Sequence, residues 1–296
     1  MRVPDSSKYN NAIRYMTEAK ARLEELSERA TTQKNFQNSS DDPSLVSSSL
    51  ALRSSIIASN GYISTSQYAE EWMNSTETSF KLMNDIITEA NTIMLKGLSE
   101  TVDANARAND YAVQITQMLN QAINIANSSH NGNYLFSGTF IKTKPFSLAD
   151  DGSVVNAACD TTGTMKRDIA PGIAITVNTD GVAAFNEFFD ALILAKHGLE
   201  TNNTTEMNTA LTDINNSLTT MNVHRTNNAA ILKQTKTGID HLKTTQNELK
   251  GLLSIKEDAN MAEAISMFNL QQTTYQTVID VCSRSLSTFN LFDVLS

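Results

Sequence analysis

A ladder of side chains near the C-terminal end, spaced by alternating steps of three and four residues, constrains this chain more than any other feature. The ladder comprises Met261, Ile265, Phe268, Gln272, Tyr275, Ile279, Cys282, Leu286 and Phe289. A mostly apolar repeat of about 3.5 residues predicts a helix that buries one narrow seam against another helix. Asn260, followed three residues later by Glu263, is typical of a helix N-cap and predicts where this helix begins.

The partner helix is predicted at the other end of the chain. Its ladder comprises Tyr9, Ala12, Met16, Ala19, Leu23, Leu26 and Ala30. We expect the two ends to pair antiparallel. Several positions in the two ladders are Ala, Gln or Cys, so an isolated pair buries little apolar area against the entropy of ordering its backbone. We therefore expect residues 1 to about 40 and about 255–296 to be weakly ordered in the free monomer and firmly helical only in an assembly.

Long helices are also predicted between the two ends. The 296 residues contain only 11 Gly and 4 Pro, so helix breakers are scarce. Asp42 is a good N-cap and Pro43 suits the first helical position, so a second helix is expected from there to Gly97. A helix of about 50 residues is roughly 80 Å long. A third helix is predicted through Ala108–Ala126, and a further long helix starts after Asn203.

The pattern changes in the middle of the chain, from about Asn133 to Asn202. Short β-prone runs occur at 134–136, 139–141 and 154–155, and alternating apolar residues at 173–177 follow a Pro-Gly turn. A short helix then carries Phe185, Phe188, Phe189 and Leu192 on its apolar side. This middle segment is predicted to be a small α/β insert.

These patterns together predict a mainly α protein, with an elongated antiparallel helical bundle or coiled-coil rod and a small α/β insert domain. The predicted division has three parts. Residues 1–42 and 255–296 are terminal coiled-coil helices, residues 43–132 and 203–254 form the helical rod domain, and residues 133–202 form the insert.

No residues have the spacing of a catalytic, cofactor or metal site. The four histidines, at 130, 197, 224 and 241, lie outside any H-E-x-x-H frame, and the two cysteines lack metal-ligand spacing. Cys282 occupies a ladder position and is interpreted as a small buried hydrophobe. Asp41 and Asp42 are interpreted as a helix cap and its neighbour, not as an acid–base pair. Without a P-loop or a G-x-S-x-G motif, the sequence predicts no catalytic residue, no cofactor, no metal and no enzyme.

The charge and hydropathy of the chain also argue against two kinds of partner, nucleic acid and a membrane. The formal net charge of −9 argues against nucleic acid, because binding phosphates requires clustered Lys and Arg. No apolar run approaches the roughly 18 residues of a membrane span. Residues 1–8 lack the apolar core of a cleavable signal peptide.

Four motifs carry a family resemblance. They are the Asn38–Pro43 segment with its S-D-D-P ending, the Gly132–Gly138 segment followed by Pro145-Phe146, residues 257–265, and the Leu291–Leu295 ending L-F-D-V-L. The third resembles the helix start shared by bacterial flagellins. The other three are similar to stretches of hook-associated protein 3, the hook–filament junction family of the flagellin superfamily. One departure is Thr32-Gln33-Lys34, which stands where that family usually has a Ser/Thr-Gly pair.

The resemblance implies a structural component of the bacterial flagellum that joins hook to filament and assembles through its terminal helices. It implies three kinds of partner: other copies of the chain, a neighbouring hook-associated protein with flagellin, and an export chaperone that binds the C-terminal helix. It further implies an extracellular location and type III export without a cleavable signal peptide. The alternatives are a minor flagellin and, from a different class, a cytosolic coiled-coil adaptor or signalling protein.

Overall fold

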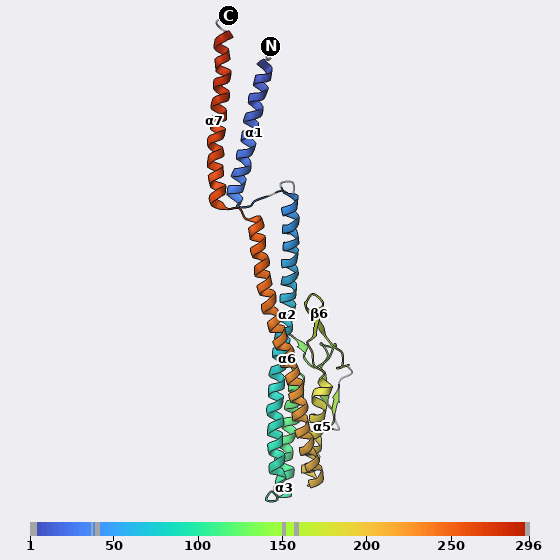
Figure 1. The fold of residues 1–296 in the computed structure, drawn as a ribbon. Coiled ribbons are helices and arrows are strands. Elements are labelled where there is room, and N and C mark those ends of the chain that lie inside the picture. The colour runs from blue at the N-terminus through green and yellow to red at the C-terminus, as the bar shows by residue number, and fades with distance from the viewer. Residues whose placement is uncertain (1–4, 37, 39–41, 150–151, 157–159, 294–296) are drawn as a thin grey trace. The chain divides into compact units, whose positions relative to one another are not determined.

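The computed structural model describes residues 5–36, 38, 42–149, 152–156 and 160–293, and Figure 1 shows the course of the chain. Its long helices are α1 (Asp5–Thr32), α2 (Pro43–Gly97), α6 (Thr204–Glu257) and α7 (Met261–Asp293). The shorter ones are α3 (Ala104–Ala106), the π-helix η1 (Arg107–Tyr111), α4 (Ala112–Ala126) and α5 (Gly181–Glu200). The mainly α class with a small β-containing segment is therefore confirmed.

The strands form short antiparallel hairpins between α4 and α5. They are β1 (Ser129–His130) with β2 (Asn133–Tyr134), β3 (Phe146–Leu148) with β4 (Val154–Asn156), and β5 (Lys166–Ala170) with β6 (Ile173–Thr176). The strand expected at 139–141 is wrong. This segment is a turn, in which the Phe140 amide donates to the Ser137 carbonyl at 3.1 Å and the Thr143 amide to the Phe140 carbonyl at 2.9 Å.

The helix boundaries follow the capping signals in the sequence. Asp42 Oδ1 accepts hydrogen bonds from the amides of Ser44 and Leu45 at 3.0 and 2.9 Å, which starts α2 at Pro43 as predicted. Asn203 Oδ1 accepts from the amides of Thr205 and Glu206 at 3.1 and 3.3 Å at the start of α6. Helix α2 ends at Gly97, also as predicted.

The chain divides into two compact units that share α2 and α6. Unit 1 contains residues 1–58 and 245–296, and unit 2 contains residues 59–244. The three-part division expected from the sequence has different boundaries from these two units, and it stays a prediction.

Unit 2 has a continuous apolar core drawn from α2, α4, α5, α6 and the hairpins. Phe80, Phe136, Phe146 and Phe185 have no exposed surface, and the rings of Phe136 and Phe185 meet edge to face with centroids 4.7 Å apart. Such an aromatic pair contributes about 0.5–1.5 kcal/mol beyond the burial of its area. A Cβ on Gly181 would lie 2.5 Å from the Phe136 carbonyl oxygen, so only glycine lets α5 start this close to the core.

Unit 1 is built on α1 and α7, which lie side by side as the two ladders predict (Figure 1). The pair is antiparallel. Gln271 Nε2 donates to the Ala19 carbonyl at 3.2 Å, while Cys282 Sγ lies 3.9 Å from the Ala12 carbonyl oxygen. The predicted contact between the two ends of the chain is confirmed.

The α1 seam is confirmed except at Tyr9, which is exposed. The α7 ladder is correct at Phe268, Tyr275, Ile279 and Cys282, which are half-buried or buried, and wrong at Met261, Ile265 and Gln272, which are exposed. At Ile265 and Gln272 the seam instead uses the residue one place earlier, namely Ala264 and Gln271. Steps of three and of four residues from Phe268 both stay near the face that meets α1, so either Ile265 or Ala264 could be buried. The small side chain of Ala264 lets α7 approach α1 more closely. The side chains of Leu286 and Phe289 lie outside those that the structure describes.

Candidate assembly surface

Two breaks in the helices meet at the base of the α1–α7 pair, and we call this region the joint. It consists of Gln33–Phe36, which follows α1, and Glu257–Asn260, which separates α6 from α7. The Asn35 amide donates to the Glu257 carbonyl at 2.7 Å, and the Ala259 amide donates to the Gln33 carbonyl at 2.8 Å. These bonds flank an antiparallel bridge between Lys34 and Asp258, so the joint is a two-strand link between distant parts of the chain.

The backbone of the joint is strained at Gln33, which has a φ of 58°. This left-handed conformation favours glycine, because a Cβ crowds the following carbonyl. It arises at the C-terminal end of α1, where the Gln33 amide still bonds to the Arg29 carbonyl at 3.0 Å. Gln33 is also the position at which the sequence departs from the Ser/Thr-Gly pair of the family it resembles. The departure changes the residue but keeps a glycine-like backbone.

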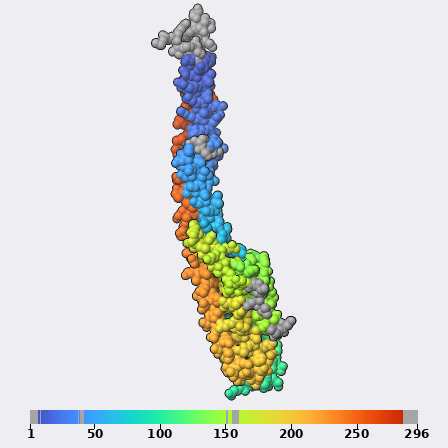
Figure 2. Space-filling model, turned by 90° about the vertical axis from the view of Figure 1, so that its right-hand side faces the viewer, coloured from blue at the N-terminus to red at the C-terminus, as the bar shows by residue number. Residues whose placement is uncertain are grey.

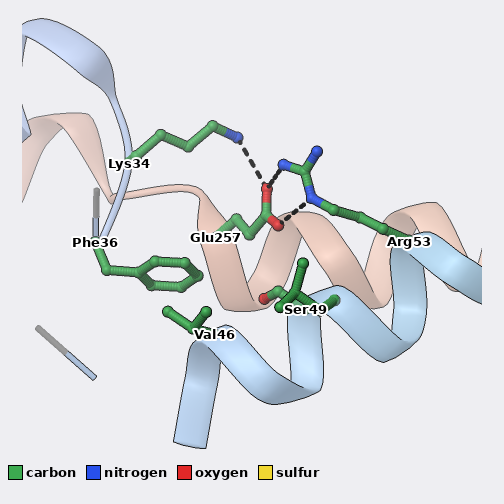
Figure 3. Close-up of a pocket in the computed structure, with 7 residues that line it drawn as sticks. Lys34, Phe36, Val46, Ser49, Arg53 and Glu257 are labelled. Carbon is green, nitrogen blue, oxygen red and sulfur yellow. Dashed lines mark hydrogen bonds and ion pairs between the residues drawn. The ribbon is translucent and has the colours of Figure 1, made fainter. Parts of the chain in front are cut away.

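A cluster of charged side chains covers the joint. We call Lys34, Arg53, Glu257 and Asp258 the Glu257 cluster. Arg53 donates from Nε and Nη2 to the two Glu257 oxygens at 2.8 and 2.5 Å, and Lys34 Nζ lies 3.5 Å from Glu257 Oε2 (Figure 3). Lys34 Nζ also donates to Asp258 Oδ1 at 2.6 Å. A single carboxylate therefore connects α2, the end of α6 and the segment that follows α1.

Burial of the Glu257 carboxyl raises its pKa, whereas its pairing with cations lowers it. Its side chain is only 6% exposed, which disfavours the charged form. The Arg53 hydrogen bond outweighs this burial, with help from Lys34, and holds the pKa of Glu257 below its ordinary value. Lys34 and Ser254 likewise hold the pKa of Asp258 low through their hydrogen bonds. The Glu257 carboxylate is held in its ionised form by contacts with Arg53 and Lys34. It is therefore poorly suited to transfer protons as a general acid or base.

A shallow pocket of about 290 Å³ opens beside the cluster. Figure 3 shows Phe36 and Val46 facing each other on one side of it, with Glu257 and Arg53 on the other. The Ser49 hydroxyl in its floor is buried and has no hydrogen-bond partner. This volume is many times that of one water molecule, so the joint is loosely packed on its apolar side.

The terminal helices expose large apolar side chains on both flanks of their seam. On α1 these are Tyr9, Ile13 and Tyr15; on α7 they are Met261, Ile265, Met267, Leu270 and Val281. Leu270 is 70% exposed and Ile13 is 58% exposed. At about 100° per residue, Ile13 and Tyr15 fall on opposite sides of the α1 seam, as do Ile265 and Leu270 on α7. Figure 2 shows the blue surface of α1 beside the red surface of α7. Apolar surface of this extent marks an interaction surface.

The histidines that we considered as ligands are scattered over unit 2 and do not converge. His130 Nδ1 lies 2.9 Å from the Ser75 hydroxyl, and His197 Nδ1 lies 2.6 Å from Glu206 Oε2. His224 lines a small polar pocket with Asn228, and His241 is exposed. Among the residues that the structure describes, no group of three or more His, Cys, Asp or Glu side chains could hold a metal ion.

The remaining candidates have structural roles where they are described. Cys282 is buried in the α1–α7 seam, as interpreted from its ladder position, and Asp42 caps α2. Cys159 and Asp41 lie outside the described residues. Within the described part of the chain, every helix is too short or too polar to cross a membrane.

Comparison with known proteins first finds a match to a protein family. Residues 5–141 match the family of the bacterial flagellin N-terminal helical region. This segment includes α1, the joint segment after it, α2 and α4, so the flagellin-like resemblance read from the motifs is confirmed.

The similarity then extends to particular proteins. Over 293 residues the chain is 22% identical to flagellar hook-associated protein 3 of Escherichia coli K12, covering 94% of this chain and 90% of that protein. A solved structure from Vibrio parahaemolyticus, assigned as a flagellar hook-associated protein, superposes with a TM-score of 0.67 at 15% identity over 73% of this chain and 99% of that one. Bacillus cereus FlgL gives 0.60 at 18% identity, over 69% and 99%. These structures share the fold of this chain.

Proposed function

We propose that this protein is a structural component of the bacterial flagellum that joins the hook to the filament. The observation that carries the proposal is the similarity to hook-associated protein 3, which extends over nearly the full length of both chains. The match covers 94% of this chain, so it takes in most of α1 and most of α7, the helices that pair in unit 1. The protein acts by assembly and not by catalysis.

The surface of unit 1 supports assembly through the terminal helices. Among the described side chains of α1 and α7, the buried ones are all small, namely Ala19, Ala264 and Cys282, while larger apolar side chains on the flanks of the seam are exposed. A tube requires each subunit to contact neighbours on more than one side. Apolar flanks on both sides of the seam fit this requirement, with other copies, a second hook-associated protein and flagellin as the neighbours.

The proposal includes export and location. The protein reaches the outside of the cell through the flagellar type III channel, and an export chaperone binds its C-terminal helix. The exposed apolar residues of α7 provide a surface for such a chaperone before assembly.

A deletion strain tests the role directly. We expect the strain to retain hooks, to lack filaments and to release flagellin into the medium, with all three effects reversed by the intact gene. The matched variant is a chain truncated after Ser254, which should be made and remain soluble but should not restore filaments. Filaments of normal length on the deletion strain would favour the minor flagellin. Absence of the protein from sheared flagella would favour the cytosolic adaptor.

A further inference from the structure

We propose that the Glu257 cluster is a latch that fixes the orientation of the α1–α7 pair against the adjoining ends of α2 and α6, and that protonation of Glu257 opens it. This inference concerns the joint itself and does not depend on the flagellar role. It assigns a conformational function to Lys34, Arg53 and Glu257.

The first argument is connectivity. Arg53 lies on α2, Glu257 is the last residue of α6, and Lys34 follows α1. The Glu257 carboxylate receives two hydrogen bonds from Arg53 and an ion pair from Lys34, so it holds all three segments at once. The Asp258 carboxylate adds a second bond to Lys34 from the segment that leads into α7.

The second argument is that the other hydrogen bonds described at the joint connect its two segments to each other and not to α2. The backbone link there consists of the Asn35–Glu257 and Ala259–Gln33 hydrogen bonds. Asn35 Nδ2 adds bonds to the Lys256 and Asp258 carbonyls at 3.3 and 2.9 Å. On the apolar side, Phe36 and Val46 border an open pocket instead of a packed core. The charged cluster therefore makes the strongest contacts between the joint and α2.

The third argument is the charge balance around Glu257. When the carboxylate is ionised, it neutralises one of the two cations and Asp258 neutralises the other. When Glu257 is protonated, Arg53 and Lys34 face each other across a neutral group, and the bidentate Arg53 contact is lost. Two further charged groups lie at the joint: Arg29 of α1, which donates to Asn35 Oδ1 at 2.8 Å, and Glu263 of α7, which lines a pocket with Arg29 and Asp258. Their charges are opposite, so the charge balance at Glu257 is set by its direct partners, Arg53 and Lys34.

The pairing of Glu257 with cations determines whether the latch opens at low or at high pH. The partners hold the pKa of Glu257 in the folded protein below its ordinary value. A carboxylate of this kind contributes its full stabilisation above the ordinary value of about 4.3, and loses it as the pH falls through the lower folded value. The latch is therefore closed at neutral pH and opens only in acid. Asp258 titrates in the same direction and reinforces the opening.

Distances between spin labels test the latch in the full-length protein. One label is placed at Ser55 on α2 and the other at Thr273 on α7, in a background with Cys159→Ser and Cys282→Ala. Both positions are exposed, and Ser55 lies about 200° around α2 from Arg53. A reference pair at Arg22 and Thr273 reports whether α1 and α7 stay together. The variants are Glu257→Gln, which removes the charge but keeps the shape, and the matched control Glu248→Gln on the exposed face of α6.

We expect a single narrow Ser55–Thr273 distance at pH 7 in the parent and in the Glu248→Gln control. Glu257→Gln should broaden this distribution at least twofold at pH 7, with the Arg22–Thr273 distance unchanged. As the pH is lowered stepwise below the ordinary glutamate range, the parent should broaden toward the Glu257→Gln distribution, and it should narrow again on return to pH 7. A narrow Ser55–Thr273 distribution in Glu257→Gln would overturn the proposal. If the distribution broadens only when the reference pair also separates, the variant has lost the helix pair itself, and that outcome also counts against a latch.

Discussion

Units 1 and 2 are both helical, yet they bury their apolar residues in very different ways. Unit 2 encloses whole aromatic rings, such as Phe80, Phe136 and Phe185, with no exposed surface. Unit 1 buries small side chains between α1 and α7 and leaves Ile13 and Leu270 mostly exposed. Since burial of apolar area is the main stabilising contribution to folding, unit 2 has the means to fold alone, whereas we expect unit 1 to need neighbouring subunits for its full stability.

The largest expected difference comes from removing one aromatic ring in each unit. Phe185→Ala should lower the free energy of unfolding of unit 2 by about 3–5 kcal/mol, because it leaves a cavity in a closed core. The matched change Phe268→Ala, at a half-buried position in the α1–α7 seam, should cost about 1 kcal/mol in the monomer. Denaturant unfolding monitored by circular dichroism measures both. Equal losses would mean that the two units are packed alike.

The Glu257 cluster should matter next most. Arg53→Met leaves the buried Glu257 carboxylate with Lys34 alone, and we expect a loss of about 1–3 kcal/mol in the stability of unit 1 at pH 7. The loss should shrink as the pH falls below the ordinary glutamate range, because the protonated carboxyl no longer needs the cation. The control is Arg22→Met on the exposed face of α1. A pH-independent loss would show that Arg53 acts by packing only.

The cap of α2 is expected to give a smaller effect. Asp42→Ala should cost about 1 kcal/mol, since it removes the acceptor for the Ser44 and Leu45 amides. Asp42→Asn keeps an oxygen acceptor and should retain both stability and function. If Asn and Ala abolished filament attachment equally, Asp42 would have a role beyond capping.

The smallest effect is expected at Gln33 and has the opposite sign. Gln33→Gly should stabilise unit 1 by about 0.5–1 kcal/mol, because glycine adopts the positive φ without the steric cost of a Cβ. Thermal unfolding of the monomer is the measurement, with Gln271→Gly inside α7 as a control that should destabilise. A destabilising Gln33→Gly would show that the glutamine side chain makes a compensating contribution.

Much of the fold could be predicted from sequence because its signals are local. The caps at Asp42 and Asn203 fixed the starts of α2 and α6, and the 3-4 ladders identified α1 and α7 as partners. The exact seam of α7 could not be predicted in full. Ala264 and Ile265 lie four and three residues before Phe268, so both fit the 3-4 repeat, and which of them is buried depends on how closely α1 approaches.

The Glu257 cluster could not be found from sequence reasoning. Its members are separated by as many as 224 positions, and a single glutamate among 32 acidic residues has no local pattern. The only hint lay at Thr32-Gln33-Lys34, where the family resemblance departs from its usual Ser/Thr-Gly pair. The exposed flanks of α1 and α7 combine ladder positions, such as Tyr9 and Ile265, with apolar residues off the ladder, such as Ile13 and Leu270. A prediction built on the seam alone does not identify them.

Hydrogen exchange on the free monomer most directly tests the central claim that unit 1 depends on its neighbours. The amides of Met261–Phe289 should exchange quickly in a verified monomer, those of the unit 2 core helices should exchange slowly, and the terminal helices should become protected once the protein is assembled. A monomer in which residues 261–289 are protected as strongly as the helix around Phe185 would contradict the account.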